Sequence, residues 1–230
     1  ERFVIPGRKN PLFTEDGQRS FLMLLKQLLK TKPYVELSHM AGILSIAKHS
    51  TGSELNMFVE YGAVEDLRYD RFFGFTQDEV CELCARHLAC TPDARVGYEG
   101  LEHWYDGYLT EDGERRFNPR SVVLALIDDS LRSCWTESGP YDEIHCYVRN
   151  NIAAVRDDLV RMAAGEPERA EMENYAASSM SLSTKDEIFS AMVVYGFLTY
   201  YDGCVSIPNH VLMLKSRSCW PRRAWATSRA

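Results

Sequence analysis

The sequence predicts a mostly α-helical chain, with a helix and a strand near its start and a helix followed by a β-hairpin near its end. Two observations predict helices. Apolar residues recur at intervals of three and four within residues 15–31, and Thr-x-x-Glu capping boxes begin at Thr76 and Thr184. A third observation predicts the hairpin, because Asp202-Gly203 separates two short runs of β-forming residues.

The first element is an amphipathic helix over residues 15–31, which Pro33 ends. Residues 34–40 then alternate loosely between apolar and polar side chains and stop near Gly42, which is typical of a strand. A strand directly after a helix is a feature of α/β units. We therefore expect the edge of an α/β sheet within residues 1–50.

The middle of the chain is predicted to be helical. The signals are the capping box at Thr76, a proline at a first helical position (Pro119) and a glycine at a helix end (Gly165). The expected helices cover residues 76–90, 96–105, 118–131, 141–150 and 152–164.

The last third is expected to begin with an irregular stretch, residues 166–183. A helix then runs from Thr184 to about Tyr195 and stops at Gly196, and the hairpin follows over residues 197–207. A helix followed by a two-stranded hairpin is the arrangement of a winged-helix-like unit. Residues 215–230 carry five basic side chains and no acidic one, and we expect this basic tail to be disordered because chain ends usually are.

Charge and cysteine usage exclude some classes of protein. The net charge of −7 argues against general nucleic-acid binding, which needs a basic face, although the basic tail offers a short contact for nucleic acid or a membrane surface. The seven scattered cysteines indicate reduced thiols in an intracellular protein, cytoplasmic or nuclear. The sequence shows no signal peptide and no run of apolar residues long enough for a membrane span.

A series of short stretches occurs in an order that resembles one family. They are residues 34–48 (YVELSHMAGILSIAK), 53–58 (SELNMF), 72–76 (FFGFT), 104–108 (WYDGY), 118–122 (NPRSV), 195–199 (YGFLT) and 207–209 (IPN). Together they resemble the AAA-ATPase-like proteins, which often carry a restriction-endonuclease-like nuclease domain.

The resemblance implies four regions. Residues 1–50 would be the end of the α/β P-loop-type core, with 34–42 as its sensor strand. Residues 51–165 would form a helical lid, 166–214 a winged-helix-like region and 215–230 the tail. Lys48 matches a basic loop residue that either contacts a phosphate or faces solvent. The other family positions are expected to be structural: Gly42, Asn56, Gly74, Trp104, Tyr105, Asp106, Gly107, Tyr108, Asn118, Pro119, Pro208 and Asn209.

The chemistry of the family is missing from this sequence. No glycine is followed by lysine, so there is no Walker A loop to hold phosphates. The nearest match to a Walker B strand, Leu126 to Asp129, is assigned to the end of a helix. No lysine has an acid or Gln two residues before it, as the nuclease would need. Ala41 stands where the sensor strand usually has a hydroxyl.

Other clusters favour structural interpretations. Cys81, Cys84, His87 and Cys90 recur every three residues on one expected helix, so their side chains spread around it and do not converge on one metal ion. The aromatic residues of 104–108 are expected to seal a core where a helix ends, with Gly107 in a left-handed conformation.

The leading hypothesis is the C-terminal part of an AAA-ATPase-like protein that is not an enzyme by itself and acts as an interaction or regulatory module. It would bind a protein partner or the missing upstream or downstream domains. We expect no cofactor in this chain, since ATP and Mg²⁺ are implied only for a complete family member. Two alternatives stay open: an ATP-binding switch or ATPase that an upstream P-loop half completes, and a nucleic-acid adaptor that uses the basic tail.

Overall fold

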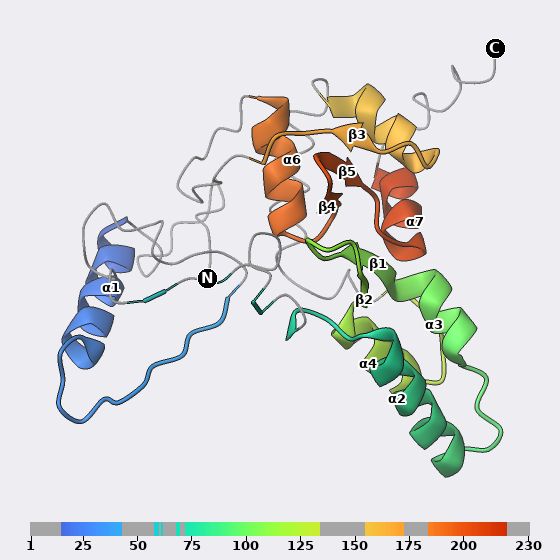
Figure 1. Cartoon of the computed structure of the whole chain (residues 1–230), viewed down its shortest axis with the longest axis horizontal. Helices are drawn as coiled ribbons and strands as arrows, with labels where there is room; N and C mark the ends of the chain where they lie inside the picture. The colour runs from blue at the N-terminus through green and yellow to red at the C-terminus, as the bar shows by residue number, and fades with distance from the viewer. Residues whose placement is uncertain are drawn as a thin grey trace. The chain divides into compact units, whose positions relative to one another are not determined.

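The computed structural model describes residues 15–42, 58–59, 61, 68–69, 72–133, 155–172 and 184–219. These residues are mostly helical, with two small antiparallel sheets. The chain divides into two compact units, residues 1–60 with 174–182 and residues 61–173 with 183–230 (Figure 1). Among the described residues, no helix combines the length and the apolar character that crossing a membrane requires. The four-region division stays a prediction.

The first unit contains α1 (Glu15–Leu29), as the apolar periodicity predicts. The helix ends two residues early, because Thr31 adopts a positive φ of 54°. The predicted strand at residues 34–40 is wrong: these residues are irregular and pair with no strand in the described part of the chain. The Val35 N–H donates to the Lys32 carbonyl in a turn, and Leu37 is 87% exposed. A single segment without a neighbouring strand cannot satisfy its backbone groups as a strand.

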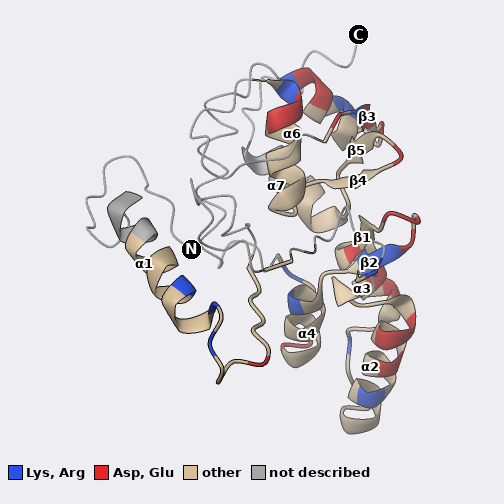
Figure 2. Ribbon diagram, turned by 60° about the vertical axis from the view of Figure 1, so that its left-hand side comes forward, with Lys and Arg blue, Asp and Glu red and all other residues tan. Residues whose placement is uncertain are grey.

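The second unit begins with α2 (Gln77–Cys90), and its predicted capping box is confirmed. The Thr76 hydroxyl accepts a bond from the Glu79 N–H, and the Glu79 carboxylate accepts one from the Thr76 N–H. Acidic residues gather at this end of α2 (Figure 2). Their negative charge stabilises the helix there, because the N-terminus is the positive end of the helix dipole.

The next two helices are shorter than the sequence predicts. α3 (Tyr98–Tyr105) begins after Gly97, and α4 (Pro119–Ile127) ends at Asp128. Asp129 accounts for both differences. It turns the chain with a positive φ of 44°, and its carboxylate accepts bonds from the N–H groups of Arg95 and Val96. The segment before α3 and the segment after α4 are thereby fixed as loops.

These three helices share a core with the strand that precedes α4. Its buried members come from α2, α3 and α4, from Phe117 in β2 (Arg115–Phe117), from the loop before α3 and from α7 (His210–Cys219). The buried residues of this core are Val80, Cys84, Val96, Leu101, Tyr105, Phe117, Val122, Ala125, Leu126 and Val211.

A hairpin that the sequence did not predict joins α3 to α4. β1 (Asp106–Leu109) pairs antiparallel with β2, and the register shifts between Asp106 and Tyr108, which marks a bulge. Gly107 has the positive φ expected of it, 124°, but it lies inside a strand and not at a helix cap. The helix itself ends at Tyr105.

The rest of the second unit contains a three-stranded sheet of order β3-β5-β4. The predicted helix that Gly165 closes is helical over residues 155–163, and the predicted hairpin is confirmed, with positive φ at both Asp202 and Gly203. The elements are β3 (Glu168–Arg169), α6 (Lys185–Val194), β4 (Thr199–Tyr201), β5 (Cys204–Ser206) and α7 (His210–Cys219).

Other predictions for this region differ from the structure or fall outside the described residues. The irregular stretch 166–183 contains β3, which forms because its two residues pair with β5. The basic tail is not disordered throughout, because α7 continues to Cys219. Residues 220–230, the predicted helix at 141–150 and the start of the one at 152–164 lie outside the described residues.

Candidate functional site

Several residues of the resemblance meet where β1 lies beside β4 and α3 lies beside α7 (Figure 1). We call this meeting point the Tyr108 joint. It connects the part built from α2, α3 and α4 to the part built from α6, the second sheet and α7. Its members are Asp106, Gly107, Tyr108, Asn118, Gly196, Pro208 and Asn209.

The Tyr108 hydroxyl is the centre of the joint. It donates a hydrogen bond of 2.9 Å to the carbonyl of Gly196, directly after α6. The side-chain amides of Asn118 and Asn209 lie close enough to the same hydroxyl to lower its pKa. Burial raises the pKa of Tyr108 far above its usual range, more than the two amides lower it, so the hydroxyl stays protonated and remains a donor.

Each of the two asparagines also begins a helix. The Asn118 side-chain oxygen accepts from the Ser121 N–H at the start of α4, at 3.0 Å. The Asn209 side-chain oxygen accepts from the Leu212 N–H at the start of α7, at 3.2 Å. Tyr108 therefore links the N-termini of α4 and α7 to the C-terminal end of α6.

Gly107 lets the backbone of β1 approach the segment before α7. A Cβ atom on Gly107 would lie 1.9 Å from the Pro208 carbonyl oxygen, which is far inside contact distance. On the other side of Tyr108, Leu109 of β1 donates its N–H to the Thr199 hydroxyl of β4 at 2.7 Å. Backbone contacts on both sides of Tyr108 thus bring the two parts together.

Asp106 brings a buried charge into the joint. It is 4% exposed, and its Oδ2 lies 3.0 Å from the Nε of Arg115, whose side chain is 60% exposed. The second carboxylate oxygen, Oδ1, is buried without a hydrogen-bond partner. Burial raises the pKa of Asp106. This effect is larger than the lowering of the pKa by Arg115 and by the Gly107 N–H.

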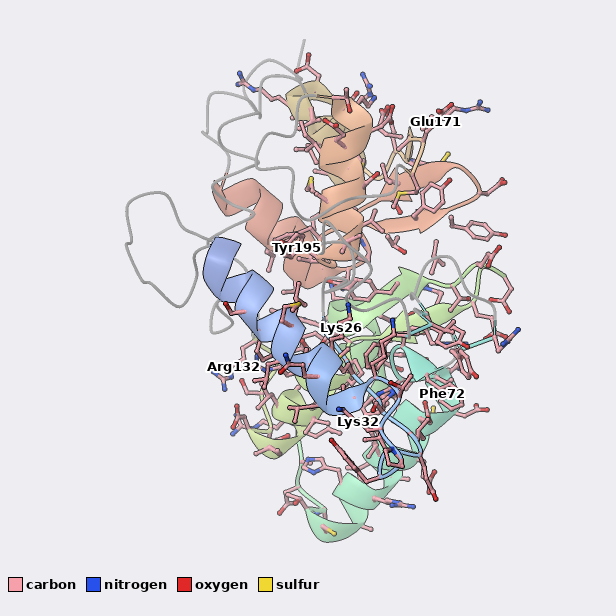
Figure 3. The ribbon with its side chains drawn as sticks, turned by 90° about the vertical axis from the view of Figure 1, so that its left-hand side faces the viewer. Lys26, Lys32, Phe72, Arg132, Glu171 and Tyr195 are labelled. Carbon is pink, nitrogen blue, oxygen red and sulfur yellow. The ribbon has the colours of Figure 1, made fainter. Side chains whose placement is uncertain are left out.

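The remaining aromatic residues of the 104–108 stretch seal the core, as predicted. Tyr105 is buried, and its hydroxyl donates to the carbonyl of Arg132 (labelled in Figure 3) at 2.8 Å. Trp104 packs against His210 of α7, with ring centroids 5.1 Å apart, and His210 also stacks on His103 at 4.6 Å. These rings hold α3 against α7.

The other predicted family positions lie elsewhere. Gly74 has a positive φ of 114° and packs its backbone on Arg116, and Pro119 is the first residue of α4. Gly42 is exposed in an irregular segment. Asn56 and Lys48 lie outside the described residues, so the phosphate contact of Lys48 stays a prediction.

The joint is built for packing and hydrogen bonding. Its amides, its tyrosine hydroxyl and its glycine are committed to contacts within the chain. On α2, Cys84 is buried while Cys81 and Cys90 are exposed, and no group of three or more metal-ligating side chains occurs among the described residues. An open hollow of about 390 Å³ beside Gly165, Pro167 and the β4–β5 hairpin is lined mostly by apolar surface.

Sequence reasoning missed Arg115, the ion-pair partner of Asp106, which lies in none of the short stretches. The hydrogen bond from Tyr108 to Gly196 spans 88 residues, so no local pattern could indicate it. The order of the short stretches was the available signal.

No family model, no curated protein and no solved structure matches this chain. The resemblance to AAA-ATPase-like proteins therefore rests on the short stretches alone.

Proposed function

We propose that this chain is the C-terminal part of an AAA-ATPase-like module and acts as an interaction or regulatory module that does not hydrolyse ATP by itself. The observation that carries this proposal is the Tyr108 joint. Its motif residues cap helices and fasten them together, as Asn118 and Asn209 do around the Tyr108 hydroxyl. Such residues supply a rigid scaffold, and a rigid scaffold is what holds a binding surface in one geometry.

Helix α1 supports a role in interaction. Phe21, Leu24 and Leu28 are 53%, 49% and 48% exposed, and their spacing of three and four places them on one stripe of the helix. Lys26 and Lys32 lie on α1 and shortly after it (Figure 3). In an α/β module, a helix of this kind packs its apolar stripe on the sheet. The stripe is consistent with a P-loop half that α1 would cover.

The missing phosphate chemistry supports the non-catalytic part of the proposal. Wrapping the β- and γ-phosphates of ATP requires the backbone N–H groups and the lysine of a Walker A loop, and the sequence has no Gly-Lys pair. Ala41 has no hydroxyl with which to position a water molecule.

A titration of this chain with fluorescent ATP and ADP analogues tests the proposal. We expect no saturable binding, because the groups that hold the phosphates are missing. An intact P-loop ATPase serves as the positive control. Saturable binding in the micromolar range would contradict the proposal, and its loss in Lys48→Ala would assign the contact to that lysine.

The stripe on α1 also favours one alternative, an ATP-binding switch that a P-loop half completes. Determining the coding sequence upstream of Glu1 distinguishes the interaction module from the ATP-binding switch. A Walker A motif there would make this chain one part of an ATPase, and the α1 stripe could then be tested directly. In that test, Leu24→Lys should weaken binding of the upstream half supplied as a separate protein.

A further inference from the structure

The Asp106–Arg115 pair at the Tyr108 joint has an unusual geometry. One partner is almost fully buried and the other mostly exposed, and only one carboxylate oxygen is used. A buried carboxylate normally has both oxygens hydrogen-bonded, because desolvating the charge is costly. The neighbouring Gly107 lies against the Pro208 carbonyl, so Asp106 sits directly beside the contact that joins the two parts of the unit.

The groups that face Asp106 come from several elements. From α3, Glu102 adds a negative charge nearby, and the Glu102 carboxylate is itself bonded to the Tyr98 hydroxyl at 3.1 Å. From β2, Arg115 supplies the positive charge. The segment Ile207 to Asn209 carries no titratable side chain, and His210 after it stacks on His103 and Trp104 of α3.

We propose that Asp106 and Arg115 form a protonation-controlled clasp at the Tyr108 joint. When Asp106 is charged, it holds the Arg115 guanidinium against β1. When Asp106 takes up a proton, the ion pair is lost, the buried carboxyl no longer carries a desolvated charge, and the Arg115 side chain is released to solvent. Acidification therefore relieves the burial cost at the joint and frees a cation on the surface.

The direction of the stability change follows from the burial of Asp106. Its pKa is raised in the folded chain, chiefly by desolvation, so the folded state binds the proton more tightly than the unfolded state. The stabilising contribution is complete below the unfolded pKa of about 3.9 and is lost as the pH rises through the folded value. This is the reverse of a well-paired surface aspartate, which stabilises a fold above its pKa.

Urea unfolding of the wild type and Asp106→Asn over a pH series tests the clasp. Asparagine mimics the neutral acid, so the urea midpoint of Asp106→Asn should exceed that of the wild type at about pH 7. The two midpoints should converge as the pH falls toward about 4. Titrations of histidines and other acids occur in both proteins and cancel in the comparison. A difference that does not depend on pH, or a wild-type advantage that is lost in acid, would overturn the proposal.

Arg115 supplies a second variant and a spectroscopic readout. Arg115→Gln changes an exposed side chain, so the variant should fold. At neutral pH, Asp106→Asn should raise the urea midpoint more in the Arg115→Gln background than in the wild type, because the charged Asp106 then has no cation beside it. In the wild type, the Arg115 Nε–H resonance should shift with the same pH midpoint as the stability difference. A resonance that stays fixed while the urea midpoints converge would show that protonation does not release Arg115 and would reject the clasp.

Discussion

Replacing Gly107 with alanine should lower the free energy of unfolding of the second unit by about 3 kcal/mol or more. The new Cβ would lie 1.9 Å from the Pro208 carbonyl oxygen, and a backbone oxygen cannot rotate away as a flexible side chain can. The positive φ of 124° adds strain that only glycine avoids. Urea unfolding followed by circular dichroism measures the loss.

Gly165→Ala is the matched control. Gly165 also has a positive φ, 94°, but a Cβ there would meet nothing within 4 Å. Gly165→Ala should lower the free energy of unfolding by about 1 kcal/mol, because only the positive φ is unfavourable for alanine there. Equal losses in the two variants would show that the close approach of Gly107 to Pro208 contributes nothing.

Replacing Tyr108 with phenylalanine should cost about 2 kcal/mol, because the ring stays while the hydroxyl at the centre of the joint is removed. The change leaves the Gly196 carbonyl without its donor and removes the polar group beside the amides of Asn118 and Asn209. Buried polar groups that lose a partner bear the full desolvation penalty. Chemical denaturation gives the value.

Tyr201→Phe controls for the loss of a tyrosine hydroxyl, since Tyr201 is exposed on β4 and its variant should stay within about 0.5 kcal/mol of the wild type. A double-mutant cycle between Tyr108→Phe and Asn209→Ala then measures the interaction between the hydroxyl and the amide. A coupling energy near zero would mean that Asn209 caps α7 independently of Tyr108.

Elements with strong local signals could be predicted from the sequence. The capping boxes at Thr76 and Thr184 fix helix starts through bonds to residues three positions away. Asp202-Gly203 fixes the hairpin, because both residues adopt positive φ at low cost. In each case the determining contact lies within a few residues of the signal.

Elements that depend on distant partners could not be predicted. β3 has two residues and exists because β5 pairs with it, and the ends of α3 and α4 depend on the Asp129 carboxylate bonding Arg95 and Val96. The segment 34–40 shows the opposite error. Its alternation was sufficient for a strand, but no described strand lies beside it.

The candidate site was predictable as a set of residues and not as a geometry. The sequence predicts structural roles for Tyr108, Asn118 and Asn209, and the structure brings both asparagines close to the Tyr108 hydroxyl. The buried charge of Asp106 and its exposed partner Arg115 were not expected, because the two residues meet only through the β1–β2 hairpin, which the sequence did not predict.

Native-state hydrogen exchange tests most directly whether the Tyr108 joint makes the second unit cooperative. The slowest amides of α4 and α6 lie on opposite sides of the joint, in segments far apart in sequence. If the joint couples them, both sets open with the same free energy in the wild type, and Gly107→Ala lowers both by the same amount. Separate opening free energies in the wild type, or a loss in Gly107→Ala that is confined to one set, would contradict the account.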